Sequence, residues 1–294
     1  MNVAELEAFS SADQFLAHAR GLPRVILEGR SDVDLFKSWF EDLQSEFDFI
    51  AAEDLARGGG CTAVQPAVRA SWDQDIPALG IVDRDYLHRS HRWALMFAAD
   101  PEAIAEASED PHVRIASLWE IEAYLLEPEL INLWVGVQRN PQPATARERD
   151  TALSRAVEEC EALLDATPFL SSGHAGGQSI GDRYFFSDKA DHIRASCRVA
   201  LEAASPERQR VAEAITAHVT DLRAKAPAND ADRLIYYLRY VDTRRLLARL
   251  EHRLGLNTDA HHALAVLMKE RALKPAEFLT MLQTAGERFA DLAA

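Results

Sequence analysis

Short apolar runs that lead into an acidic residue constrain the fold of this chain more than any other feature of its sequence. Residues 24–27, Arg-Val-Ile-Leu, are followed directly by Glu28, and residues 78–82, Ala-Leu-Gly-Ile-Val, are followed directly by Asp83. Such runs are typical of strands that are buried on both faces, as strands of a parallel sheet are. A helical pattern follows the first run, so the sequence predicts βαβ units.

The alternation of strand and helix patterns extends to about residue 118. Two more strands are expected at residues 47–52 and 112–116, and two helices at residues 31–47 and 61–72. Residues 1–20 have the pattern of a short amphipathic helix, and after Trp119 the patterns are helical almost throughout. We therefore predict an α/β fold. A Rossmann-like parallel sheet flanked by helices would occupy residues 1–118, and a mostly α-helical domain residues 119–294.

Composition excludes some classes of protein. The 294 residues carry a net charge of −15, with a pI near 5.1. This charge argues against non-specific coating of nucleic acid, which depends on neutralising phosphates, although a local basic patch remains compatible with it. No apolar run is long enough for a membrane helix, and the N-terminus lacks a signal-peptide pattern. Cys61, Cys160 and Cys197 form no metal-ligand spacing, which favours reduced thiols in a cytoplasmic protein.

Three acidic residues are expected at one edge of the sheet. Ligands of open α/β sheets bind at the carboxyl ends of the strands, where Glu28 and Asp83 end their strands and Asp85 follows two positions later. Three carboxylates in one place repel one another, and a divalent cation relieves that repulsion. Oxygen ligands favour Mg²⁺ or Mn²⁺, which can activate water against a phosphate.

Other roles are open to the same residues. Acids in the first turn of a helix are stabilised by its dipole, and Asp34 with Ser31 has the spacing of a capping box. Asp83 and Asp85 could be turn formers. Asp83 could also be the phosphoacceptor of a receiver-type domain.

Basic side chains for a substrate are expected in the C-terminal half. Three arginines share one helical stripe at i, i+4 and i+8: Arg245, Arg249 and Arg253. Three nearby tyrosines could stack on unpaired bases: Tyr236, Tyr237 and Tyr240. The alternative is an ordinary charged helix face above core tyrosines. Arg84, between the two aspartates, could contact a phosphate or offset the local negative charge.

Four segments resemble a known family of nucleases. VILEGRSDVDLF and GIVDRDY resemble the two acidic motifs of Toprim domains, which occur in topoisomerases, primases and overcoming-lysogenization-defect (OLD) nucleases. LWEIEAYLLEPEL resembles the Glu-Ile-Glu-Asn-Tyr-Leu-Leu signature of the Toprim-like domain-of-unknown-function family 4435. RYVDTRRLLARLEHRL resembles the C-terminal helical element of that family. The family includes the effector subunit of the PARIS anti-phage system.

The resemblance implies a metal-dependent endonuclease. Its expected metal ligands are all carboxylates: Glu28, Asp32, Asp83, Asp85, Glu120 and Glu122. Of these, Glu28, Asp83 and Asp85 would act in catalysis. Glu120 and Glu122 are spaced i, i+2 and cannot share a helix face, so either they precede a regular helix or only one points into the site. The chain departs from the signature at Ala123, where the family has Asn.

The resemblance also implies a biological setting. The protein would be an anti-phage effector that is controlled by an ABC-type ATPase, cleaves transfer RNA and forms a homodimer when active. Cleavage of DNA is the alternative on the side of the OLD nucleases. A non-catalytic module that binds a partner protein is the alternative of a different class.

Overall fold

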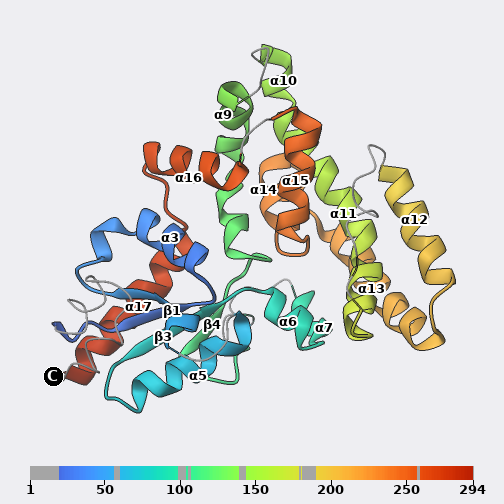
Figure 1. The fold of residues 1–294 in the computed structure, drawn as a ribbon. Helices are drawn as coiled ribbons and strands as arrows, with labels where there is room; N and C mark the ends of the chain where they lie inside the picture. The colour runs from blue at the N-terminus through green and yellow to red at the C-terminus, as the bar shows by residue number, and fades with distance from the viewer. Residues whose placement is uncertain are drawn as a thin grey trace. The chain divides into compact units, whose positions relative to one another are not determined.

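A computed structural model describes residues 20–55, 60–98, 104, 107–138, 144–178, 180, 190–256 and 259–293 (Figure 1). The helix expected over residues 1–20 lies outside this part of the chain except for its last residue. The protein divides into two compact units. Unit 1 comprises residues 1–83, 105–116 and 268–294, and unit 2 comprises residues 84–104 and 117–267.

Unit 1 is built on a parallel sheet of four strands. They are β1 (Arg24–Leu27), β2 (Asp48–Ala51), β3 (Ala78–Val82) and β4 (Val113–Ile115). Their order in the sheet is β2-β1-β3-β4, and every neighbouring pair is parallel. β1 and β3 are buried along their whole length, as apolar runs of this kind predict. The predicted α/β class and all four predicted strands are confirmed.

Helices of unit 1 follow the predicted alternation, with one difference. They are α3 (Arg30–Trp39), the 3-10 helix η1 (Glu41–Leu43), α4 (Ala52–Leu55), α5 (Cys61–Trp72) and α17 (Ala276–Ala293). The predicted bounds of α5 are confirmed, but α3 ends eight residues before the predicted residue 47. Phe40 leaves the helical conformation at φ −120° and ψ 43°, and its N–H still donates to the carbonyl of Phe36. The chain then passes through η1 before β2 begins at Asp48.

Two crossovers place helices on both faces of the sheet. The chain passes from β1 to its neighbour β2 through α3, and then back across β1 to β3 through α5. Right-handed crossovers in opposite directions put α3 and α5 on opposite faces, as Figure 1 shows. Gly80 lets α5 approach β3 closely. A Cβ atom there would lie 2.8 Å from methyl groups of both Val64 and Val68.

The C-terminal helix α17 packs in unit 1. The ring of Phe278 lies 4.8 Å from that of Phe36 and stacks on Trp39 of α3. At the other end, Phe289 meets Trp72 of α5. Because residues 268–294 belong to unit 1, the observed division of the chain differs from the expected boundary between residues 118 and 119. The sequence predicts the helical character of residues 268–294, but the core that this helix joins depends on aromatic partners over 200 residues earlier in the chain.

Unit 2 consists of helices. They are α6 (Asp85–Arg89), α7 (Trp93–Met96), η2 (Ile121–Leu125), α9 (Pro128–Gln138), α10 (Ala146–Asp150), α11 (Ala152–Ala175), α12 (Ala190–Glu202), α13 (Pro206–Lys225), α14 (Asp230–Tyr237), α15 (Thr243–Leu254) and most of α16 (Ala260–Glu270). α11, the longest, contacts α9, α12, α13, α14 and α15. The predicted helical character after residue 119 is confirmed for the described residues. Within them, no helix combines the length and apolar character needed to cross a membrane.

Candidate metal centre

The ends of β1 and β3 meet at the point where the sheet reverses its winding. The chain leaves β1 toward β2 and leaves β3 toward β4, on opposite sides of the sheet. In open α/β sheets this reversal opens a crevice at the carboxyl ends of the strands, which is the usual place for a ligand. Glu28 follows β1 and Asp83 follows β3. The backbone N–H of Asp83 donates to Oε1 of Glu28 at 3.0 Å.

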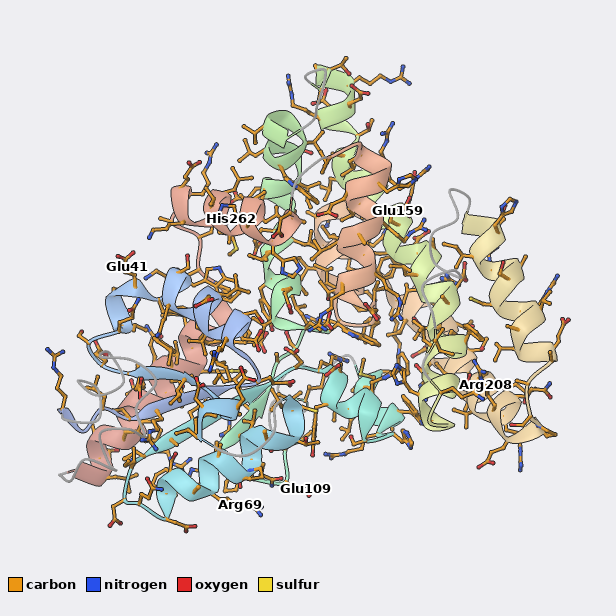
Figure 2. The ribbon with its side chains drawn as sticks, viewed as in Figure 1. Glu41, Arg69, Glu109, Glu159, Arg208 and His262 are labelled. Atoms are coloured by element: carbon orange, nitrogen blue, oxygen red, sulfur yellow. The ribbon has the colours of Figure 1, made fainter. Side chains whose placement is uncertain are left out.

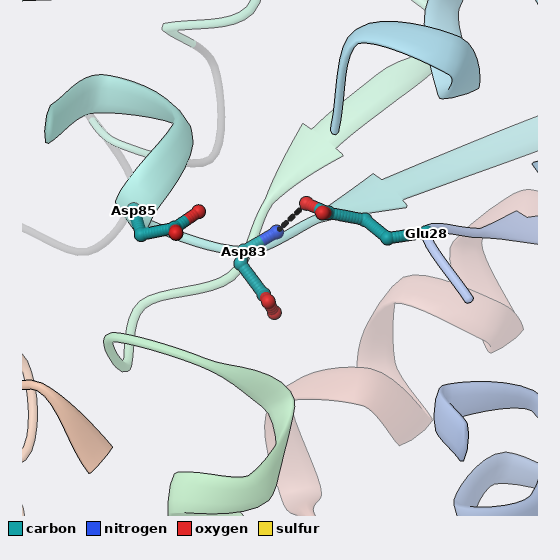
Figure 3. Close-up of side chains that lie close together, drawn as sticks. All are labelled: Glu28, Asp83 and Asp85. Carbon is teal, nitrogen blue, oxygen red and sulfur yellow. Dashed lines mark hydrogen bonds between the residues drawn. The ribbon is translucent and has the colours of Figure 1, made fainter. Parts of the chain in front are cut away.

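Asp85 completes a cluster of three buried carboxylates (Figure 3). Glu28, Asp83 and Asp85 each offer an oxygen atom, and these atoms lie within 4.8 Å of one another. None of the three residues is more than 8% exposed. Asp85 is the first residue of α6, and its backbone N–H donates to the carbonyl of Trp119 at 3.1 Å. The structure therefore brings together the three acids that the sequence places at strand ends.

The chemistry of this cluster fits a hard divalent cation. Buried carboxylates this close repel one another, and their solvation by water is largely lost. Carboxylate oxygens are the ligands that Mg²⁺ and Mn²⁺ prefer, and Mg²⁺ takes few protein ligands together with water and substrate phosphate. Three carboxylates could hold such an ion and leave positions for water and substrate.

Asp32, and not the predicted Asp34, has the capping role at the start of α3. Its carboxylate accepts a hydrogen bond from the N–H of Gly29 at 3.0 Å, which caps the start of α3. Asp34 is exposed. Among the described residues, the group that could hold a metal includes Glu28 but not Asp32. The expectation that Asp32 is a direct metal ligand is therefore not supported by its position, because its carboxylate is directed to the helix start.

Glu120 and Glu122 are buried, but both face Arg244 rather than joining the three-carboxylate group. Glu120 is extended and immediately precedes η2, which allows both side chains to reach the same guanidinium. Glu120 lies 3.5 Å and Glu122 3.8 Å from nitrogens of Arg244. The Oε2 atom of each has no hydrogen-bond partner in the described part of the chain.

Burial strongly perturbs Glu120. Loss of solvation, together with the nearby carboxylates of Asp242, Glu122 and Asp85, raises the pKa of its carboxyl to about 8 against the opposing effect of Arg244. The carboxyl of Glu120 is therefore mostly protonated at pH 7 and loses its proton as the pH rises through about 8. A carboxyl that titrates near neutrality in a pocket is often part of a functional site.

Arg84 is placed where it cannot contact a substrate, which corrects its expected role. The side chain is completely buried and has its guanidinium over the ring of Tyr240. It donates to the carbonyls of Met96 at 3.0 Å, Ser117 at 2.8 Å and Ala98 at 2.9 Å. Burial lowers its pKa to about 10, so the charge persists at neutral pH. Arg84 ties the start of α6 to the segments of unit 2 that contain Met96, Ala98 and Ser117.

The arginine stripe is also largely engaged inside unit 2. Arg249 is buried and Arg253 exposed, and both donate to the buried carboxylate of Glu159. Figure 2 labels Glu159 on α11. Arg245 pairs with Asp242 and donates to the carbonyl of Ile180 at 3.1 Å. The expectation that this stripe binds substrate is wrong for Arg249, because the helix turns it toward α11. The other two arginines are held by carboxylates.

Two of the three nearby tyrosines likewise belong to the core, and Tyr236 is half-buried. Tyr237 and Tyr240 are buried, and their hydroxyl groups donate to Glu161 and to the carbonyl of Ala98. Neither ring is accessible to a base. Of the two alternatives for this region, core tyrosines beneath a charged helix face are the ones observed.

A pocket of about 400 Å³ in unit 2 was not foreseen from the sequence. Asp85, Glu120 and Arg244 line it together with His88 and His174. A weak signal for His88 existed, because it follows Asp85 by three positions and so shares its face of α6. His174 lies 89 positions after Asp85, and no motif in the sequence connects the two.

Comparison with known proteins adds no relative. No protein-family model matches the chain, and no curated protein sequence is significantly similar to it. The assignment of a function therefore rests on the residues of this chain and their geometry.

Proposed function

We propose that this protein is a metal-dependent phosphodiester hydrolase that cuts nucleic acid. The observation that carries the proposal is the meeting of Glu28, Asp83 and Asp85, buried and within 4.8 Å of one another, at the strand ends where the sheet reverses its winding. A structural role alone gives no reason to bury three carboxylates together, since each loses hydration and repels the others.

Each of these residues would have a separate role in binding the cation or in positioning its ligands. Asp83 and Asp85 would hold the cation with Glu28, whose Oε1 also accepts from the backbone of Asp83 and so keeps the two strand ends in register. When bound, Mg²⁺ or Mn²⁺ would polarise a phosphoryl group and lower the pKa of a water molecule that attacks in line. Arg84, which directly precedes Asp85, would hold the start of α6 in place through its bonds to the carbonyls of Met96 and Ser117.

The motif resemblance extends this proposal to a setting. It favours RNA, such as transfer RNA, over DNA as the substrate. It also favours an anti-phage effector that is regulated by an ABC-type ATPase and is active as a homodimer. The net charge of −15 is compatible with a partner-bound protein whose nucleic-acid contacts are confined to one place.

Cleavage by the purified full-length protein tests the proposal. Total RNA and plasmid DNA would be incubated separately with the protein in Mg²⁺, in Mn²⁺ and in EDTA, with the Glu28→Gln variant as a control. We expect cleavage with metal only, and at least about 100-fold less by the variant. Equal cleavage by the variant would exclude a catalytic role for Glu28.

The rival class is a non-catalytic module that docks on a partner. Ala123, at the position where the resembled signature has Asn, is the feature of the sequence that favours it. It predicts no cleavage of either nucleic acid with any metal, both for the protein alone and after any co-purifying partner has been removed. That result would overturn the proposed hydrolase.

A further inference from the structure

The pocket beside Asp85 has the size and the chemistry of a site for one nucleotide. Its volume of about 400 Å³ lies at the small end of the range for small-molecule sites. All of its lining residues belong to unit 2. They include an exposed cationic side chain, Arg244, and an exposed side chain with a ring, His174. Asp85 lines the pocket and also belongs to the three-carboxylate group. A nucleotide bound in this pocket would therefore lie next to a phosphate held at Asp85.

Arg244 supplies a phosphate contact at the wall of the pocket. Its side chain is 66% exposed, although it is held near Glu120 and Glu122 through ion pairs of 3.5 and 3.8 Å. A guanidinium presents its N–H donors in a planar fork that matches the oxygens of a phosphate. The pairing holds the arginine over the pocket, and a phosphate can approach it from the solvent side.

His174 supplies a ring on which a base can stack. It is exposed in the last turn of α11 and packs edge-to-face on His88, with ring centroids 4.8 Å apart. His88 is buried, and its Nε2 lies 2.8 Å from the hydroxyl of Ser171. The rings of Trp93 and Trp119 pack on His88 as well. These contacts hold His88 in place, and its ring supports the ring of His174 at the wall of the pocket.

We propose that this pocket binds one unpaired nucleotide of the strand that is cut, with its phosphate on Arg244 and its base on the ring of His174. The inference rests on the proposed hydrolase and narrows its substrate to single-stranded nucleic acid. A paired and stacked base cannot enter such a pocket unless it is flipped out of the duplex. Exposed histidine and arginine side chains recognise unpaired bases and their phosphates without reading sequence.

Binding of nucleoside monophosphates tests the proposal without any cleavage. Ribo- and deoxyribonucleoside monophosphates would be titrated into the full-length protein in EDTA by calorimetry, with the unphosphorylated nucleosides and inorganic phosphate as reference probes. We expect monophosphates to bind more tightly than either reference probe, since only they engage both groups. A difference between the two sugar series identifies the pocket as one for RNA or for DNA.

Substitutions locate this binding. Arg244→Ala is expected to weaken it about 10- to 100-fold, as loss of a charge-assisted contact does. His174→Ala is expected to weaken it about 10-fold, while His174→Phe, which keeps a ring, retains most of the affinity. Arg198→Ala, on the exposed face of α12, is the matched control and leaves it unchanged. Equal affinities of Arg244→Ala and the unsubstituted protein would overturn the proposal.

The two proposals fail in different ways. One outcome is cleavage that depends on Glu28, together with monophosphate binding that is unchanged by substitution of Arg244 or His174. It would support the proposed hydrolase and contradict the proposal that this pocket binds the substrate. The opposite outcome is monophosphate binding that depends on both residues, without any cleavage. It would support the nucleotide-binding pocket and contradict the proposed hydrolase. Cleavage of a hairpin within its stem, at a rate equal to cleavage in its loop, would overturn the restriction to unpaired nucleotides.

Discussion

The backbone N–H of Asp83 donates to Oε1 of Glu28 at 3.0 Å and thereby joins the ends of β1 and β3, residues 55 positions apart in the sequence. Because one oxygen of Glu28 already accepts this bond, its carboxylate has a fixed direction before any ligand arrives. Preorganisation of this kind is expected where a group must hold a cation without rearranging. The same contact also allows the charge of Glu28 to be separated experimentally from its hydrogen bond.

Glu28→Gln removes the charge but keeps an acceptor oxygen for the N–H of Asp83. We expect the melting temperature in EDTA to stay the same or rise, because a buried charge is lost while the strand-end bond is kept. Binding of Mn²⁺, measured by calorimetry, should weaken by at least about 100-fold, since a direct ligand is worth no less than its supporting groups. Glu53→Gln, a partly exposed acid on α4, is the control and should bind Mn²⁺ normally.

Asp85→Asn should stabilise the protein when no metal is present. Two unit charges separated by 4.8 Å, the upper limit for oxygens in this cluster, repel by about 3 kcal/mol at an effective dielectric constant of about 20. Hydrogen bonds offset part of this, so we expect a gain of about 1–2 kcal/mol and a melting temperature in EDTA higher by about 2–8 °C. Addition of Mg²⁺ should raise the melting temperature of the unsubstituted protein more than that of the variant.

The exposed Asp34 on α3 provides the control for this experiment. Asp34→Asn lowers the net negative charge by the same amount without touching the cluster, so it separates a local effect from a change in overall charge. A lower melting temperature of Asp85→Asn in EDTA would contradict mutual repulsion of the carboxylates.

Glu120 should make unit 2 less stable as the pH rises. Its pKa in the folded protein, about 8, lies above the ordinary value of 4.5, so the folded state binds the proton more tightly than the unfolded state. This stabilisation is fully present below pH 4.5 and is lost as the pH rises through about 8. Its size is a few kcal/mol, since each pKa unit corresponds to about 1.4 kcal/mol.

Glu120→Gln is neutral at every pH and should remove this dependence. Urea unfolding in EDTA at several pH values between 5 and 9 would measure it, with the variant gaining stability relative to the unsubstituted protein toward pH 9. Glu213→Gln, exposed on α13, serves as the control. Parallel stability profiles of the unsubstituted protein and Glu120→Gln would show that this carboxyl does not titrate as expected.

Arg84→Lys should destabilise the protein rather than weaken binding of a substrate. A lysine cannot reach the carbonyls of Met96, Ala98 and Ser117 at once, and each buried acceptor left unsatisfied costs about 1–3 kcal/mol. We expect a loss of about 3 kcal/mol in the free energy of unfolding, measured by urea denaturation. An unchanged stability combined with weaker binding of nucleic acid would instead support a phosphate contact.

Gly80→Ala should disturb the packing of α5 on β3. The added methyl group would lie 2.8 Å from Val64 Cγ1 and Val68 Cγ2, in a core where overpacking costs about 1–3 kcal/mol. The double variant Gly80→Ala/Val68→Ala should be more stable than the sum of the two single effects, because the smaller side chain relieves the overlap. Strict additivity in urea denaturation would contradict the contact.

Local sequence was enough to predict the sheet and the place of its acids. β3 is a continuous apolar run, the other strands are mostly apolar, and the helix at 61–72 has a regular apolar face, so hydrophobic patterning alone locates them. Parallel strands bring their carboxyl ends to one edge whatever the rest of the chain does. Glu28, Asp83 and Asp85 were therefore placed together without knowledge of any contact.

Only the tertiary structure decided which charged side chains are exposed and which are buried. Arg249 and Arg244 lie five positions apart on one helix, yet the first is buried against Glu159 and the second is exposed beside a pocket. Arg84 lies between two acids but is directed to carbonyl groups. Periodicity specifies the angle between side chains around a helix, not the partner that each face meets. That partner depends on packing between segments far apart in sequence, such as α11 with α15, and the same packing brings His174 into a pocket with Asp85.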